Sequence, residues 1–454
     1  TGTRLQALLD KIAALETAGG GTLAEQLAWI SSYAVDGGDY TIELKANEAI
    51  APAALSYSGK TVTVTLKGDT AERTVSLGST GSLFTVGSGV TLILDNNVTL
   101  QGRSDNTASL VYVNSGGTLE MKGTAKITGN TASSTSSSSY AASWGGGVYV
   151  YGSFTMSGIA TVSGNTASST STSLSSYAAS SGGGVYVGAG SFTMNDNATV
   201  SGNITSHNSP GAASSGGGGV FVDSGSFTMN GSATVSGNTN SSSTYISPSG
   251  GGVYVGAGSF TMSDSATVSG NTASGYGGGV FVYNGSSFTM SGSATVSGNT
   301  ASSYGGGGVY VSDGGSSFTM SDSATVSGNT APGGGGGVLV CGMSNFTMNG
   351  NASVSGNESS YGGGVYLDVG GYSSDIGIFT KTGGIIYGSN ETNPALRNTV
   401  KDNGVELTDQ GAAVYEAGTQ RRRETTVTAA QNLTATVSWD GSSYQYTFTG
   451  QWDD

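Results

Sequence analysis

The sequence is poor in the residues that usually fix or charge a fold. It has one cysteine, Cys341, so no internal disulfide can form, and stability must come from burial and hydrogen bonding. Only 10% of the residues are charged, and residues 127–380 contain no lysine or arginine. No apolar run reaches the length of a membrane-spanning helix, roughly 18 residues or more. The chain begins at Thr1 without a signal peptide, so we expect a mature chain from which one was removed.

The charge that is present is mostly negative. The net charge is -14, which disfavours nucleic acid and anionic membrane surfaces as partners. No spacing of His, Cys, Asp or Glu predicts a metal site, and no motif predicts a cofactor. The acidic balance therefore argues against a polyanionic partner over most of the molecule.

What is abundant is glycine, with 79 residues, and it falls at regular intervals. Eight copies of an apolar-X-apolar segment each follow a run of at least three glycines, and most of them read Val-Tyr-Val or Val-Phe-Val. The copies start at Val148, Val185, Val220, Val253, Val280, Val309, Val338 and Val365. Such periodicity argues for a repeat fold and against disorder.

Each repeat contains two further short segments, such as Phe260-Thr261-Met262 and Ala266-Thr267-Val268. In all three segments the first and third residues are apolar. A period of two places them on one face and the middle residue on the other, as in a strand and not in a helix. Three strands that cannot bury their inner face alone must stack on the next repeat. The sequence therefore predicts an all-β fold, a right-handed, single-stranded parallel β-helix of about ten coils with a helical N-terminal cap.

The corners of the coil are of two kinds. One carries Gly or Asp at a fixed place, including Asp196, Asp264 and Asp322, which we interpret as turn residues. The other ends in an asparagine that we expect to form a structural hydrogen-bonded ladder. These asparagines are Asn130, Asn165, Asn203, Asn238, Asn271, Asn299, Asn329 and Asn357.

The chain divides into three parts on this pattern. Residues 1–39 are an N-terminal cap whose leucines predict an amphipathic helix over residues 3–16. Residues 40–420 form the β-helix, regular over 83–370 and irregular at both ends. Residues 421–454 are a C-terminal β cap, predicted from the alternation around Val437 and Tyr446 to be a hairpin, and the run Arg421–Arg423 is expected to be a solvated patch.

The repeat from Gly145 to Thr166, with its Gly-Gly-Gly-Val start and Ser-Gly-Asn-Thr end, resembles the passenger repeats of chlamydial-type polymorphic outer membrane proteins. Those repeats alternate GGA[ILV] and FxxN motifs, and Val162 stands here where the second motif has Phe. The resemblance covers residues 83–370, and the sequence has no C-terminal autotransporter barrel pattern. It implies an extracellular or bacterial cell-surface protein with structural or adhesive duties.

The binding hypothesis rests on the middle residues of the first strand, which should point outward as one column. They are Tyr112, Tyr149, Tyr186, Phe221, Tyr254, Phe281, Tyr310 and Tyr366, broken at Leu339. Exposed rings could stack on sugars or pack on protein, and a self-stacking ladder partly covered by loops is the alternative. The corner after the asparagine carries variable Ser/Thr-rich loops, longest over residues 131–249, beside this column. We expect a glycan or protein partner, or self-association into filaments or layers.

Two other functions compete with this one. Some parallel β-helices are polysaccharide lyases or hydrolases, but catalysis needs grouped carboxylates. Here Asp196, Asp264 and Asp322 lie two coils apart, about 9.6 Å at the strand spacing, and the single histidine, His207, falls in a Ser-rich loop where we expect it to be solvated. We therefore expect no enzyme. Regular outward threonines of the second strand, such as Thr261, are similar to those of ice-binding β-helices.

Overall fold

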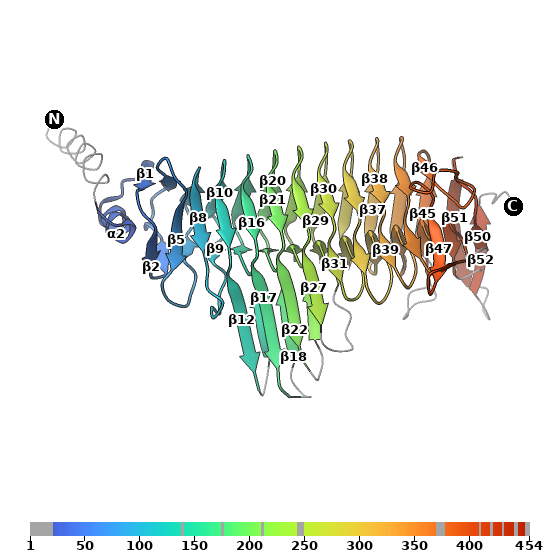
Figure 1. The fold of residues 1–454 in the computed structure, drawn as a ribbon, viewed down its shortest axis with the longest axis horizontal. Coiled ribbons are helices and arrows are strands. Elements are labelled where there is room, and N and C mark those ends of the chain that lie inside the picture. Colours follow the sequence, from blue (N-terminus) through green and yellow to red (C-terminus); the bar gives the residue numbers. More distant parts are fainter. Residues whose placement is uncertain are drawn as a thin grey trace.

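The computed structural model describes residues 21–137, 140–173, 177–209, 213–242, 249–368, 377–407, 410–417, 421–428, 431–439 and 444–449. The chain forms a long stack of parallel coils, and a flat arm projects sideways from the coils of its N-terminal half (Figure 1). The predicted parallel β-helix is confirmed. The helix expected over residues 3–16 lies outside the described residues.

Each coil is built from three short strands that pair with their equivalents one coil away. In a central coil these are β24 (Val220–Val222), β25 (Ser226–Met229) and β26 (Thr234–Ser236). We call the sheets that contain them sheet 1, sheet 2 and sheet 3, in that order. Sheet 3 has 12 strands, one per coil, so the stack is longer than the ten or so coils that the sequence indicated. The additional coils lie at the ends, where the motif is irregular.

Identical side chains stack inside the coils because the register is constant from one repeat to the next. Phe227 pairs with Phe260, and Phe260 with Phe288, in parallel register. Their ring centroids lie 4.8 and 4.7 Å apart with nearly parallel planes, and each ring is 1% exposed. Columns of Val, Met and Ala are equally buried. The core is therefore one continuous cluster that runs along the stack.

The glycine runs have a steric cause. Gly250 adopts φ +70°, a conformation that favours glycine. A Cβ on the next residue, Gly251, would lie 2.4 Å from the carbonyl oxygen of Gly278 and 2.5 Å from the carbonyl carbon of Thr272. The coil can close at this corner only where no side chain separates the backbones.

A helix covers the N-terminal coil. Helix α2 (Leu23–Tyr33) begins with a capping box between Thr22 and Glu25 and buries Leu23 and Ile30. This cap is the described part of the N-terminal region, and it lies after the segment for which a helix was predicted.

Antiparallel strands end the stack at its C-terminus. The predicted hairpin is present as β51 (Gln431–Trp439) and β52 (Tyr444–Thr449), and β51 pairs antiparallel with β45 (Ile378–Lys381) of sheet 2. The arginine run forms β50 (Arg421–Arg423), antiparallel to β49 (Val414–Glu416), and Arg422 in it is exposed, as expected for a solvated residue. Both pairings interrupt the parallel ladder that a further coil would need.

The long insertions are not the loops that the sequence suggested. Their first halves extend a fourth sheet and their second halves form a fifth, and together these strands make the arm (Figure 1). The fourth-sheet strands of the arm are β12 (Thr131–Ser136), β17 (Thr166–Ser171), β22 (Ile204–Asn208) and β27 (Thr239–Ser242). The fifth-sheet strands are β13 (Tyr140–Trp144), β18 (Tyr177–Ser181) and β23 (Ala213–Gly216). The two sheets pack face to face on small side chains such as Ala167 and Ala178.

Candidate functional site

The predicted aromatic column forms on the outer side of sheet 1. Tyr149 lies opposite Tyr186, and Tyr186 opposite Phe221, in parallel register. The ring centroids of these pairs are 4.7 and 5.2 Å apart, and the rings are stacked. The same contact joins the column from Tyr112 to Tyr310 before Leu339 interrupts it.

This stacking changes what the column can bind. Because each ring covers the faces of its neighbours, the faces are not available to stack on sugar rings. Tyr149 and Tyr186 are 8% exposed and Phe281 is 6% exposed. The rings therefore form the self-stacking ladder that was the alternative to an open aromatic platform. Tyr112, Phe221, Tyr254, Tyr310 and Tyr366 remain partly exposed, and binding by the column stays a prediction.

Part of the cover comes from the arm. The indole of Trp144, at the end of β13, has its centroid 6.2 Å from the ring of Tyr186. In β23, a Cβ on Gly216 would lie 2.7 Å from the rings of both Phe221 and Tyr254. The fifth sheet thus rests against the aromatic column. Sequence analysis placed the insertions beside the column but did not predict this packing.

Burial also keeps the tyrosine hydroxyls of the column neutral. It raises the pKa of Tyr254, and burial together with the nearby Asp223 raises the pKa of Tyr186. The Tyr310 hydroxyl lies 3.0 Å from the Cys341 sulfur, and burial raises the pKa of that thiol. A buried thiol with a raised pKa is a poor nucleophile. The column is therefore suited to packing and hydrogen bonding rather than to catalysis.

The asparagine ladder is present and fully hydrogen-bonded along the stack. In a typical step, the backbone nitrogen and Nδ2 of Asn238 both donate to Oδ1 of Asn271 at 2.9 Å. Nδ2 of Asn238 also donates to the carbonyl of Val200, one coil earlier, at 3.1 Å. Each amide thus links three coils from a position with no solvent exposure. Its role is structural.

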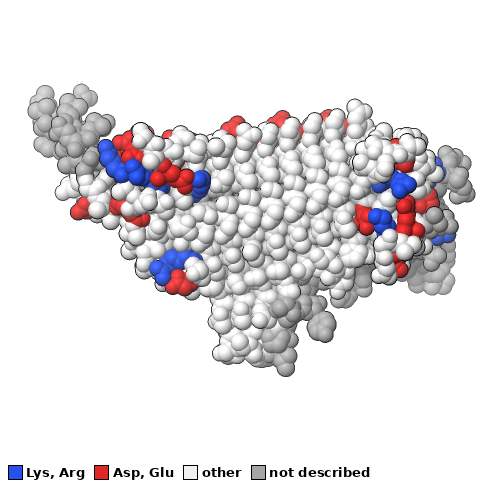
Figure 2. All heavy atoms as spheres, in the orientation of Figure 1, with Lys and Arg blue, Asp and Glu red and all other residues white. Residues whose placement is uncertain are grey.

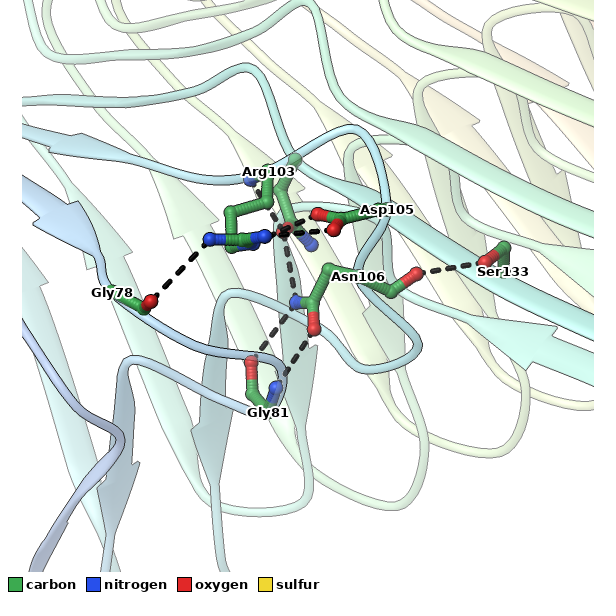
Figure 3. Close-up of polar contacts among 7 residues, drawn as sticks. Gly78, Gly81, Arg103, Asp105, Asn106 and Ser133 are labelled. Carbon is green, nitrogen blue, oxygen red and sulfur yellow. Dashed lines mark hydrogen bonds and ion pairs between the residues drawn. The ribbon is translucent and has the colours of Figure 1, made fainter.

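The ladder extends beyond the predicted residues at both ends. At the N-terminal end Asn106 donates to Oδ1 of Asn130 at 3.0 Å and bonds to Gly81 through both its amide atoms (Figure 3). At the other end, Asn357 donates to Oδ1 of Asn398 at 2.9 Å. Neither Asn106 nor Asn398 is preceded by glycine, so the Gly-Asn pattern did not reveal them.

The aspartates of the other corner are turn residues. Asp196 has φ 57° and Asp264 has φ 55°, and each carboxylate accepts a hydrogen bond of 2.9 Å from the backbone of the preceding coil, at Gly158 and Gly231. Among the described residues, no group of three or more His, Cys, Asp or Glu could hold a metal ion.

Sheets 2 and 3 present rows of hydroxyl groups to solvent. In sheet 2, Ser226 pairs with Ser259 and Thr228 with Thr261, so like side chains repeat at the strand spacing of about 4.8 Å. The outward residues of both sheets are partly exposed. The threonines of the sheet 2 row are Thr155, Thr193, Thr228, Thr261, Thr289, Thr319 and Thr347.

The arm carries the one histidine, and its environment differs from the expectation. His207 lies in β22 with its side chain 3% exposed, and neither ring nitrogen has a hydrogen-bond partner. Burial lowers the pKa of the imidazole to about 4. The interpretation as a solvated loop histidine is therefore wrong. The alternation of β22 places it on the inner face, between Ser169 and Ser242.

The arm also has an open cavity of about 340 Å³ across three neighbouring strands of the fourth sheet. Its lining includes His207 and uncharged hydroxyl and amide side chains. The principal members are Ser168, Thr170, Ser206, Asn208 and Ser241. Sequence reasoning missed this site because it treated the insertions as loops.

Lysine and arginine occur only before residue 127 and after residue 380, whereas the central coils also contain acidic residues, among them Asp223 and Asp313 directly after two strands of sheet 1. In Figure 2 the lysines and arginines, with most acidic residues, gather over the first and last coils, and the face between them is uncharged except for acidic side chains along the upper edge. The arm is uncharged on this face as well. Ion pairs such as Arg73–Asp69 and Lys401–Glu358 belong to these end regions.

Within the part of the chain that the structure describes, no helix has the length and apolar character needed to cross a membrane. Neither protein-family models, nor curated proteins, nor solved structures gave a match to this sequence.

Proposed function

We propose that this protein is a non-catalytic structural and adhesive element of an extracellular or bacterial cell-surface layer, which contacts glycan or protein surfaces through uncharged hydroxyl groups. The observation that carries the proposal is the combination of a long stack of coils with a central region that has no basic residues and only scattered acidic ones. Residues 127–380 contain no lysine or arginine, and their outward strand positions are mostly Ser, Thr and Tyr. Such a surface makes contact by hydrogen bonding and not by ion pairing.

The placement of the carboxylates in the described central coils supports a non-catalytic role over the carbohydrate-active alternative. The corner carboxylates of Asp196, Asp264 and Asp322 each bind a backbone amide and lie two coils apart. A glycoside hydrolase needs two carboxyl groups about 5 to 9.5 Å apart that face one substrate. Successive corner carboxylates lie just beyond that range, at about 9.6 Å from the strand spacing, and each is already engaged in closing a turn.

The test is adhesion as a function of salt. Purified protein should bind cells or insoluble polysaccharides, or associate with itself, and the binding should change little between low and high ionic strength because few charges contribute. Binding that disappears at high salt would contradict the proposal. Release of reducing or unsaturated sugars from any tested polysaccharide would instead favour an enzyme.

Ice binding is a second candidate because of the regular rows on sheet 2. Thr228, Thr261 and Thr289 repeat in register on a flat parallel sheet. Thermal hysteresis that is lost in Thr261→Tyr but kept in the control variant Ser206→Tyr on the arm would support this function. A parent protein without thermal hysteresis would exclude it.

A further inference from the structure

The arm is the feature that the geometry of the coil does not require. The C-terminal half of the stack closes the same corner with two-residue strands such as β31 (Thr272–Ala273) and β35 (Thr300–Ala301). In the N-terminal half the equivalent strands extend into the arm, which stands away from the body (Figure 1). Because a coil closes without it, the arm needs a different explanation.

The outer face of the fourth sheet in the arm carries mostly hydroxyl and amide groups, with Ile204 as an exposed apolar residue among them. Along the register, Ser168 lies opposite Ser206 and Ser206 opposite Ser241, so hydroxyl groups repeat at the strand spacing. The hydroxyl of Ser206 donates to that of Ser168 at 3.2 Å, so neighbouring strands hold these groups at hydrogen-bonding separation. The insertions 131–144, 166–181, 204–215 and 239–249 contain no Asp, Glu, Lys or Arg.

We propose that this face of the arm, centred on the cavity lined by Ser168, Ser206 and Asn208, is a binding site for an uncharged glycan chain. The inference rests on the adhesive function proposed above and names its site and ligand class. The cavity of about 340 Å³ is shallow and widely open to solvent, so a short stretch of a chain would lie along it rather than be enclosed by it. The rest of the chain then extends across the adjoining strands.

The lining decides between ligand classes. An ionic ligand would find no opposite charge among the lining residues, and an apolar ligand would take hydroxyl groups such as those of Thr170 and Ser241 out of water without replacing their hydrogen bonds. Sugar hydroxyls both donate and accept hydrogen bonds, as do serine and threonine hydroxyls, so a neutral glycan satisfies both surfaces. Water-mediated bonds can complete the contact on so open a surface.

The buried histidine lies on the opposite face of the same strand. The alternation of β22 points Ser206 and Asn208 outward into the cavity and His207 inward, where its side chain is 3% exposed and neither ring nitrogen has a hydrogen-bond partner. The imidazole therefore does not contact a ligand in the cavity. It affects the site only through the stability of the strand that carries Ser206 and Asn208, because an unsatisfied polar group is costly to bury.

The experiment compares two matched double variants of the full chain. Ser206→Ala with Asn208→Ala removes two hydrogen-bonding groups from the cavity, and Thr261→Ala with Thr289→Ala removes two from sheet 2 of the body. The probes are insoluble cellulose, chitin and mannan in pull-down assays, and soluble dextran by calorimetry. We expect the parent and the body variant to bind at least one probe equally, and the arm variant to bind it at least about tenfold more weakly.

Hydrogen exchange of the parent gives a reading that depends on no variant. The bound probe should slow exchange in residues 166–171 and 204–208 and leave residues 287–290 of sheet 2 unchanged. Equal binding by the parent and the arm variant, or protection confined to the body, would overturn the arm site while leaving adhesion intact. Failure of the parent to bind any neutral glycan, together with retained adhesion to cells, would also overturn it without touching the proposed function. Loss of adhesion to cells as well would remove both.

Discussion

Acid should open the arm before it unfolds the stack, because His207 is buried without a partner. The pKa of this imidazole is lowered from 6.5 to about 4 by burial, and each pKa unit corresponds to about 1.4 kcal/mol. The folded arm therefore favours the neutral ring by roughly 3 kcal/mol relative to an opened arm in which the ring is in water.

The direction of the pH dependence follows from the lowered pKa of His207. A histidine whose pKa is lowered by folding contributes full stability above its unfolded pKa of 6.5, and that contribution declines as the pH falls and is lost below about 4. The described strands packed around β22 are β17, β27, β18 and β23, and their one other titratable side chain is that of Tyr177. Within these strands, therefore, no charged group offsets the effect.

Hydrogen exchange between pH 7 and pH 4, corrected for the intrinsic rate, measures the opening of residues 166–171 and 204–208. The readout must be local, because acid also weakens the N-terminal coils, where hydrogen bonds from Arg73 hold the pKa of Asp69 below its usual range. The matched control is His207→Ser. Serine is the residue found at the equivalent positions of the two neighbouring strands, Ser169 and Ser242.

The parent arm should lose most of its protection by pH 4, and the His207→Ser arm should keep it. If the two arms respond to acid alike, or if the parent arm stays protected at pH 4, the charge on His207 does not control the arm.

Three further predictions concern the stack and can be read from denaturant unfolding. Phe260→Ala should lower the free energy of unfolding by roughly 3–5 kcal/mol because the ring is buried between two others. The control Thr261→Ala, at an outward position, should lower it by about 0.5 kcal/mol or less, and equal losses would mean that the Phe column is not the core. Asn271→Ala should cost about 2–4 kcal/mol, since it removes the acceptor of two buried donors of the preceding asparagine, and a loss below about 1 kcal/mol would argue against the ladder. Asp264→Ala should be more destabilising than Asp264→Gly by about 1 kcal/mol, because φ is 55° there, and the reverse order would contradict the left-handed turn.

The stack could be predicted from the sequence because its signal is a contrast between apolar and polar residues at a period of two. The segment around Phe260 alternates buried and half-buried positions, and the equivalent strands of the neighbouring coils pair with it in register. The ladder was equally visible, since Gly-Asn recurs at one corner. Both features depend on residues that are close in sequence and repeated without change.

The arm could not be found in this way because its strands lack that contrast. In β17 the inward Ala167 and Ser169 differ little in polarity from the outward Thr166 and Ser168, so no hydrophobic alternation appears. One signal was available: residues 131–136 and 166–171 have the same sequence, Thr-Ala-Ser-Ser-Thr-Ser, and they pair residue for residue. Repetition within the insertions, rather than hydrophobic pattern, indicated that they were strands.

The packing of the fifth sheet on the aromatic column could not be predicted from the sequence either. An outward position in a coil is exposed only if nothing else packs on it, and the element that packs there is the fifth sheet. Gly216 allows that sheet to approach the rings of Phe221 and Tyr254, but a glycine in a Ser-rich insertion is also typical of a loop. The N-terminal cap was also visible in the sequence. Thr22 and Glu25 have the spacing of a capping box, which marks the start of α2.

These features together favour the arm over the body as the place where a partner is recognised. The outward groups of the body either close turns, as Asp264 does, or stack on one another, as Tyr186 does, so much of their bonding capacity is used within the molecule. The arm adds a second layer whose outer face is not needed to close any coil. It also contains a buried histidine without a hydrogen-bond partner, which we expect to lower the stability of the arm at acid pH. A segment that carries such an unsatisfied group and is dispensable for closing the coil is where selection for binding is expected to act.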